Sequence, residues 1–143
     1  MKNYFLLSIL SALILFACAG ENNETTLISK FVLNGTETSI SDSEYKIRSG
    51  NIYFESKSLE KHFNVIAKEI VPQRQLGLCR DDLCIPIEVN NDDANSAFME
   101  NDTYYVPIVK LLENLGEDVS WNDEELSLEV VMKKNFGGFD LDK

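Results

Sequence analysis

The sequence predicts an α+β fold that consists of two degenerate strand–helix–β-hairpin repeats, with mainly antiparallel strands and one helix per repeat. Three observations lead to this prediction. Short β-capable segments are separated by turn-forming residues, two segments carry the apolar spacing of an amphipathic helix, and these two segments lie in similar surroundings 52 residues apart. Similarity of this kind outweighs the propensity of any single residue, because it repeats a whole supersecondary unit.

The amino-terminal segment predicts export from a bacterial cell and attachment to a membrane. Lys2 precedes an apolar run over residues 4–17, which is too short to span a bilayer comfortably and therefore indicates a signal peptide. The sequence "LFAC" resembles a bacterial lipobox, in which Cys18 is the acylated residue. Cleavage after Ala19, at an A-x-A site formed by Ala17 and Ala19, is the alternative and would leave no anchor.

These features divide the chain into four parts. We assign residues 1–17 to a lipoprotein signal peptide, residues 18–26 to a lipidated flexible tether, residues 27–133 to the α+β domain and residues 134–143 to a flexible tail. The expected location is the periplasmic face or the outer surface of a bacterial membrane, with the membrane as a partner through the acyl chains. A net charge of −11 over 143 residues argues against nucleic acid as a partner.

The first half of the domain opens with two predicted hairpins. Asn34-Gly35 separates two β-capable segments and is a strong signal for a two-residue hairpin turn. A second pair of strands is expected at residues 45–48 and 52–54, on either side of the turn formed by residues 49–51.

A helix is expected directly after these strands. Ser56 is the candidate N-cap, and Leu59, His62 and Phe63 follow the spacing of one helix face. Asn64 tolerates the left-handed conformation that ends many helices, so the helix is expected to stop there.

A second helix is expected in "YYVPIVKLLENLGEDVSW". Pro107 suits the first position of a helix and Gly116 suits the position just after its end. Strands are expected to follow at residues 119–121 and 126–131, the latter because apolar and polar residues alternate along it. The apolar stripe of the helix consists of Ile108, Leu111, Leu112 and Leu115.

Alignment of the two halves predicts an internal duplication. The repeats are expected at about residues 50–89 and residues 102–132. A shift of 52 residues superimposes Tyr53 on Tyr105, Leu59 on Leu111, Phe63 on Leu115, Asn64 on Gly116 and Ala67 on Val119.

The second half resembles a known family, the copper amine oxidase N-terminal-like domain. The resemblance is carried by the tyrosine-valine-proline of residues 105–107, by Leu115-Gly116 at the end of the helix, and by Val119 and Trp121. The first half is similar but has Phe54-Glu55 where the family has valine-proline. This resemblance implies an exported α+β module with an interaction or structural role. It brings no active site, because the copper ligands and modified tyrosine of the oxidase belong to a different domain.

No residue is assigned a catalytic or metal-binding role, and no cofactor is expected. His62 is the single histidine of the chain, and its place on the apolar stripe between Leu59 and Phe63 favours a half-buried core residue over a general base. No nucleophile elbow, zinc-protease motif or phosphate-binding glycine loop occurs in the sequence. We therefore expect a protein that is not an enzyme.

Two cysteines are expected to form a disulfide. If Cys18 carries lipid, Cys79 and Cys84 are the remaining thiols, and an exported domain occupies a compartment where disulfides persist. Trp121 and Leu126 enclose a polar loop of the same length, so both loops are expected to occupy equivalent places in the two repeats. Residues that bracket a hairpin loop lie close enough for a disulfide, which would act as a structural staple.

Two alternatives for this cysteine pair remain open. A redox pair is the first, although the spacing is wider than C-x-x-C, and Asp81 and Asp82 would raise the pKa of a thiol against the opposing effect of Arg80. A zinc site with one of these aspartates is the second, although no further Cys or His pair completes four ligands.

The aromatic residues suggest candidate binding side chains. Because neighbouring residues of a strand face opposite sides, one tyrosine of each strand is expected to be exposed, and Tyr104 and Tyr53 are the candidates. Trp121 is expected to pack against the helix.

The predicted function is a membrane-anchored, extracytoplasmic, non-catalytic binding or structural module of the bacterial cell envelope, which binds a protein or another envelope component. The alternative is a thiol–disulfide redox protein that acts through Cys79 and Cys84.

Overall fold

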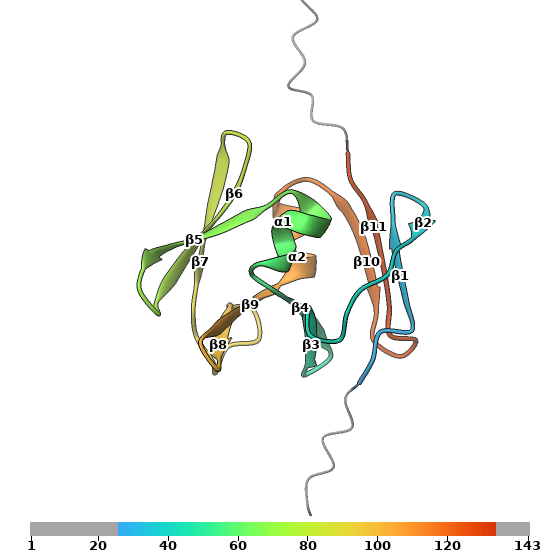
Figure 1. Ribbon diagram of the computed structural model, residues 1–143, viewed down its shortest axis with the longest axis horizontal. Helices are drawn as coiled ribbons and strands as arrows, with labels where there is room; N and C mark the ends of the chain where they lie inside the picture. Colours follow the sequence, from blue (N-terminus) through green and yellow to red (C-terminus); the bar gives the residue numbers. More distant parts are fainter. Residues whose placement is uncertain (1–25, 134–143) are drawn as a thin grey trace, which may run out of the picture.

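The structure is a computed structural model that describes residues 26–133 (Figure 1). The expected signal peptide, the lipidation site Cys18, nearly all of the tether and the carboxyl-terminal tail therefore lie outside the described residues. Within residues 26–133, no helix has the length and apolar character needed to cross a membrane.

The described residues form an α+β fold with three sheets and two short helices, and most strand pairs are antiparallel, as the sequence predicts. The sheets have the strand orders β10-β11-β1-β2, β3-β4-β9-β8 and β5-β6-β7. Figure 1 shows α1 and α2 in the middle of the molecule, between the sheet of β5, β6 and β7 on one side and the sheet that contains β1, β10 and β11 on the other.

The elements have the following bounds. The strands are β1 (Lys30–Leu33), β2 (Thr36–Glu37), β3 (Tyr45–Arg48), β4 (Asn51–Glu55), β5 (Ile66–Val71), β6 (Gln75–Arg80), β7 (Leu83–Glu88), β8 (Phe98–Glu100), β9 (Thr103–Pro107), β10 (Asp118–Asn122) and β11 (Ser127–Val131). The helices are α1 (Ser58–Phe63) and α2 (Ile108–Asn114).

Strand β1, near the start of the described chain, lies beside β11, near its end. It pairs with β2 in the hairpin that the sequence predicts, and it also pairs in parallel with β11, where Phe31 lies opposite Leu128. Both of these side chains are buried in the main core. The first and last strands therefore lie side by side in the middle of one sheet and cover the same side of the core.

The predicted turns are confirmed by their backbone angles. Asn34 and Gly35 have φ values of 53° and 76°, and Ser49 and Gly50 have φ values of 51° and 74°. Two successive residues in the left-handed region are typical of the tight hairpin turns whose twist matches that of the flanking strands. Residues that tolerate positive φ thus mark both hairpins, but the second turn consists of residues 49–50 and not of residues 49–51, because Arg48 pairs with Asn51.

The helix ends are also as expected, whereas the start of α1 differs. Asn64 ends α1 with φ 54°, and Gly116 follows α2 with φ 81°. Lys57 occupies the N-cap position of α1 in place of Ser56. The hydroxyl of Ser58 donates to the carbonyl of Glu55 at 2.8 Å, which ties the first turn to the end of β4.

The main core lies where the helices meet the sheets. Its ring contacts join Phe31, Phe54 and Phe63, with centroids 5.1 to 6.1 Å apart. The other buried members are Tyr45, Ile52, Leu59, Val65, Leu76, Leu78, Ala97, Val106, Ile108, Leu111, Leu112, Leu128 and Val130.

The expected equivalence of the two polar loops is wrong. The hairpin that follows α2 is β10–β11, which contains Trp121, but the hairpin that follows α1 is β5–β6. Cys79 and Cys84 lie in the next hairpin, β6–β7, whose turn has two residues because Arg80 and Leu83 still pair across the strands. The error arose because local spacing does not reveal that one half carries an additional strand, β7.

Candidate functional site

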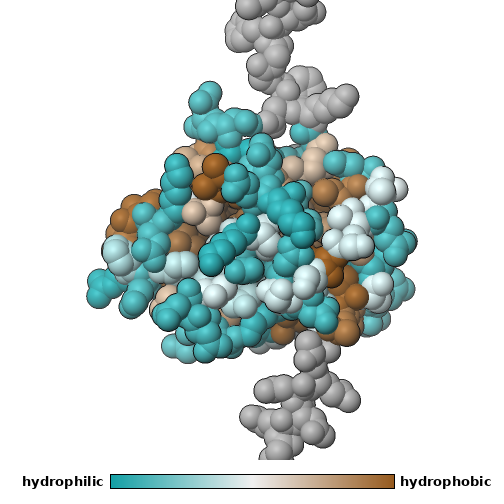
Figure 2. Space-filling model, viewed as in Figure 1, coloured by the Kyte–Doolittle hydropathy of each residue, from teal (hydrophilic) through white to brown (hydrophobic). Residues whose placement is uncertain are grey.

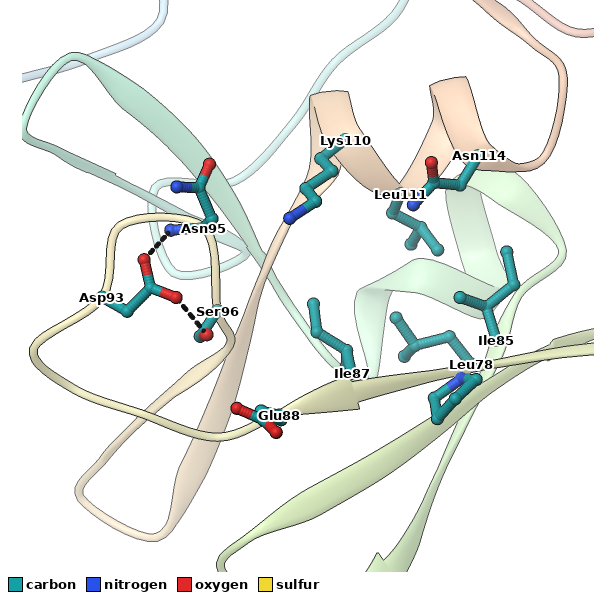
Figure 3. A pocket seen from close by; sticks show the side chains of 11 residues that line it. Leu78, Ile85, Ile87, Glu88, Asp93, Asn95, Ser96, Lys110, Leu111 and Asn114 are labelled. Carbon is teal, nitrogen blue, oxygen red and sulfur yellow. Dashed lines mark hydrogen bonds between the residues drawn. The ribbon is translucent and has the colours of Figure 1, made fainter.

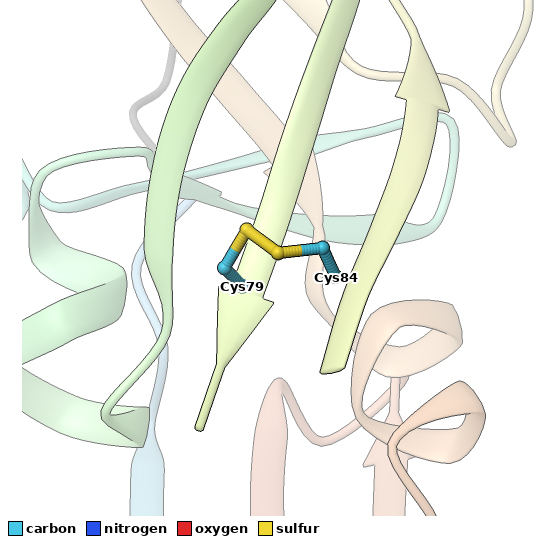
Figure 4. The surroundings of a disulfide bond; sticks show 2 residues. All are labelled: Cys79 and Cys84. Atoms are coloured by element: carbon cyan, nitrogen blue, oxygen red, sulfur yellow. A yellow bond between two sulfur atoms is a disulfide. The ribbon is translucent and has the colours of Figure 1, made fainter. Parts of the chain in front are cut away.

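A disulfide closes the β6–β7 hairpin (Figure 4). Cys79 and Cys84 are direct cross-strand partners with an S–S distance of 2.08 Å and a Cα–Cα distance of 4.0 Å. Cys79 is half-buried and Cys84 is exposed. The side chains on either side of Cys79 are buried, so the disulfide lies on the opposite, outward face of the sheet. The predicted pairing is thus present, and its position leaves it accessible.

Arg80 does not neutralise the acidic turn of this hairpin. Its guanidinium points inward and donates to the carboxylate of Glu117, and only 6% and 2% of these two side chains are exposed. The same carboxylate accepts the backbone N–H of Lys133 at 2.5 Å. This buried ion pair therefore joins the disulfide hairpin to the segments that flank the sheet of β10 and β11.

A cleft of about 270 Å³ lies between the β6–β7 hairpin, helix α2 and the loop of residues 93–96 (Figure 3). Its apolar wall consists of side chains from β6, β7 and α2, namely Leu78, Ile85, Ile87 and Leu111. Its polar rim consists of Glu88, Asp93, Asn95, Ser96, Lys110 and Asn114. The cleft thus has an apolar part and a charged part.

The loop at the rim is held by Asp93. One carboxylate oxygen of Asp93 accepts the backbone N–H of Asn95 at 2.9 Å, and the other accepts the hydroxyl of Ser96 at 2.7 Å. These hydrogen bonds, with a smaller contribution from the charge of Lys110, hold the pKa of Asp93 below its usual value. The charge of Asp93 therefore structures the loop and keeps the rim in place.

The sequence prediction missed this cleft. Lys110 and Asn114 were visible as neighbours on one face of the predicted second helix, because they are four residues apart. Nothing in the local pattern indicated that β7 would face them, because the sequence predicts this strand as part of a hairpin and gives no information on its tertiary neighbours.

The prediction that Tyr53 is exposed is wrong. Only 1% of Tyr53 is exposed, its hydroxyl donates to the carbonyl of Ala94 at 2.7 Å, and its ring lies 5.0 Å from that of Phe98. Phe98 and Tyr105 complete a small second core on this side of the sheet. Alternation along β4 sends Tyr53 and its neighbours to opposite faces, but both faces are covered.

Tyr104 and Trp121 occupy partly exposed positions. Tyr104 is half-buried, its hydroxyl hydrogen-bonds to the carboxylate of Glu69, and this bond raises the pKa of Tyr104. Trp121 packs against the main core and donates from Nε1 to the carbonyl of Gly50 at 2.8 Å. Neither aromatic residue lines the cleft.

His62 is a core residue, as its place on the helix stripe predicts. Its ring is buried against Phe31 and Phe54, and Nε2 lies 3.2 Å from Oε1 of Glu44. Burial lowers the pKa of His62, and this effect exceeds the opposing effect of the Glu44 carboxylate.

Acidification is therefore expected to destabilise the protein through His62. The pKa of a histidine in the unfolded chain is about 6.5 and that in the folded protein is lower, so the unfolded state binds the proton first. Stability should be complete above about pH 6.5 and should fall as the pH drops through this value toward the lower, folded pKa. Urea unfolding at about pH 8, about pH 6.5 and about pH 5.5 would measure this slope.

The control for this prediction is His62→Gln, which keeps a polar group beside Glu44 and should flatten the slope. His62 is the single histidine of the sequence, so no other side chain with an ordinary pKa titrates in this window. A folded-state pKa above 6.5, measured by NMR, would contradict the prediction.

The fold and the cleft define a small α+β domain with a disulfide-closed hairpin beside a mixed apolar and charged cleft. Comparison of the chain with protein-family models, curated proteins and solved structures gives no significant match. Among residues 26–133, no group of three His, Cys, Asp or Glu side chains is placed to hold a metal ion.

Proposed function

We propose that this chain is a lipid-anchored, extracytoplasmic, non-catalytic binding module of the bacterial cell envelope. The observation that carries the binding role is the cleft beside the disulfide hairpin, because concave sites that combine apolar walls with a few polar groups are typical of ligand binding. The anchoring role rests on the lipobox-like sequence that ends at Cys18.

Two titratable side chains, Asp93 at the rim of the cleft and His62 in the core, support a binding role over a catalytic one. Both carboxylate oxygens of Asp93 are engaged within their own loop, and His62 is packed in the core against Glu44. These groups hold the structure in place, and their hydrogen bonds would have to break before they could act as a general acid or base.

We further propose that the domain arose by duplication, in line with the resemblance to the copper amine oxidase N-terminal-like domain. Strands β4, β5 and β6 have counterparts in β9, β10 and β11 at a shift of 52 residues, and α1 has a counterpart in α2. Strand β7, which carries Cys84 and half of the apolar wall, then belongs to one copy alone. The cleft would be a feature added to the duplicated framework.

The anchor is tested by Cys18→Ala in the full chain. This substitution removes the thiol that would receive the acyl groups, so the variant is expected to lose acylation and to leave the membrane fraction. Metabolic labelling with a fatty acid and cell fractionation would measure both effects. Acylated, membrane-bound Cys18→Ala protein would refute the lipobox assignment.

Cross-linking of the tagged full chain in intact cells would test whether the anchored protein contacts an envelope component.

The disulfide is expected to act as a staple. The double variant Cys79→Ser/Cys84→Ser should lose on the order of 2 kcal/mol of stability, because the bond closes a short loop, and should still fold. Denaturant unfolding of the oxidised protein and of the variant would measure the difference. The reduced wild-type protein serves as the control, because it lacks the bond and keeps both cysteine side chains.

A thiol–disulfide redox function is the second candidate, because the exposed Cys84 makes the bond accessible. The two functions differ in their response to glutathione. A staple should resist millimolar glutathione, whereas a redox pair should exchange rapidly near the potential of the periplasmic couples. Rapid exchange would overturn the staple, and resistance would overturn the redox function.

A further inference from the structure

The apolar half of the cleft fits one short aliphatic group. Leu78 and Leu111 are buried in the main core and form its base, and Ile85 and Ile87 on β7 are half-buried beside them. Figure 3 shows these four side chains gathered on one side of the cleft, between α2 and β7. The volume of about 270 Å³ lies just below the range of about 300–1,000 Å³ that is usual for drug-sized ligands. The ligand is therefore small.

The charged half presents one cation, Lys110, and two carboxylates, of which Asp93 is engaged by hydrogen bonds within its own loop and Glu88 is not. Within residues 26–133, neither Lys110 nor Glu88 has an ion-pair partner within 4.0 Å, whereas four other Lys and Arg side chains do. Figure 3 shows Lys110 extending from α2 toward the 93–96 loop, and Glu88 at the end of β7 below it. A ligand with a single charge would pair with one of these exposed groups and gain nothing from the other. A zwitterion satisfies both.

The edge of β7 disfavours an extended peptide as the ligand. Pro86 lies in the middle of β7 and has no N–H to offer to an added strand. The carbonyl of Glu88 already accepts the N–H of Ala97 at 2.9 Å. Side chains, and not the strand backbone, must therefore hold the ligand.

These three features point to a site for a free aliphatic amino acid. We infer that the cleft binds such a zwitterion, with its carboxylate at Nζ of Lys110, its ammonium group at the carboxylate of Glu88 and its side chain against Ile85 and Ile87. The 93–96 loop, held by Asp93, forms the fixed wall next to the charged groups. This inference rests on the proposed binding role and names the class of ligand.

The test is calorimetric titration of the full chain in lipid nanodiscs, with empty nanodiscs as the blank. Four probes separate the contributions: L-leucine, 4-methylpentanoate without the ammonium group, 3-methylbutylamine without the carboxylate, and N-acetyl-leucine amide without either charge. L-leucine is expected to bind most tightly, and the uncharged amide at least about tenfold more weakly, because charge-assisted hydrogen bonds are the stronger ones.

Two cleft variants and two matched controls assign the charges. Lys110→Gln should weaken L-leucine and 4-methylpentanoate about tenfold and leave the amine unaffected, and Glu88→Gln should weaken L-leucine and the amine. Both side chains are exposed, so neither substitution should prevent folding. Lys57→Gln and Glu129→Gln make the same charge changes at exposed positions outside the cleft and should have no effect.

Two results would overturn the inference. The first is wild-type protein that does not bind L-leucine. The second is L-leucine affinity that is equal in Lys110→Gln and Lys57→Gln. A chain that is acylated and cross-links to an envelope component but fails these titrations would refute the ligand class alone. A chain that binds L-leucine in the cleft but is neither acylated nor membrane-bound would refute the anchored role and leave the site standing.

Discussion

Arg80→Met is expected to lower the free energy of unfolding by about 3–5 kcal/mol, because it leaves the carboxylate of Glu117 buried without its counter-charge. Both side chains are almost fully buried, so water cannot replace the lost partner. The backbone N–H of Lys133 would remain as a hydrogen-bond donor, but it carries no full charge. A domain of this size is stable by only about 5–15 kcal/mol, so the loss is severe.

A double variant separates the ion pair from the packing of its side chains. Arg80→Met/Glu117→Leu removes both charges together and should be more stable than Arg80→Met, because no charge is left unpaired. Denaturant unfolding of the two variants and the wild type would give the difference. A double variant that is less stable than the single variant would show that Glu117 stabilises the fold without Arg80, and would contradict the cost assigned to its unpaired charge.

Phe54→Ala is expected to have a comparable effect, a loss of about 3–5 kcal/mol, because it leaves a cavity in the centre of the main core. Phe54 is 0% exposed, and its ring lies within 5.1 to 6.0 Å of the rings of Phe63, Phe31 and His62. These neighbours come from β1 and α1, so the cavity would open where a sheet meets a helix.

Two further substitutions provide reference values for the loss in the free energy of unfolding. Phe54→Leu keeps most of the volume and should cost clearly less than Phe54→Ala. Val131→Ala truncates a side chain that is 44% exposed, and it should cost less than about 1 kcal/mol. Equal losses at positions 54 and 131 would show that the core is not packed as described. Urea unfolding of the three variants would measure these losses.

Local features of this fold were predictable because they depend on a few adjacent residues. The turns at Asn34-Gly35 and Ser49-Gly50 and the ends of both helices at Asn64 and Gly116 follow from the tolerance of these residues for positive φ. The burial of His62 follows from its place on an apolar helix stripe. Each of these predictions is confirmed without reference to the rest of the chain.

The errors share a different origin, since each depends on what lies across a sheet. Tyr53 was expected to be exposed because strand residues alternate between faces, yet a second cluster with Phe98 covers the outer face. The loop between Cys79 and Cys84 was matched to the loop after Trp121 because their lengths in the sequence agree. The cysteine loop, however, follows the second strand after α1, whereas the loop after Trp121 follows the first strand after α2. Alternation and spacing describe one strand and contain no information about its neighbours.

By itself, the sequence determined the fold class, the turns, the helix ends and the pairing of Cys79 with Cys84, because each of these depends on residues close together in the chain. The tertiary structure alone decided the parallel pairing of β1 with β11, the partner of Arg80 and the cleft beside Lys110. These contacts join residues that are distant in sequence. Their energies come from burial and pairing that exist only after the sheets have packed around the helices.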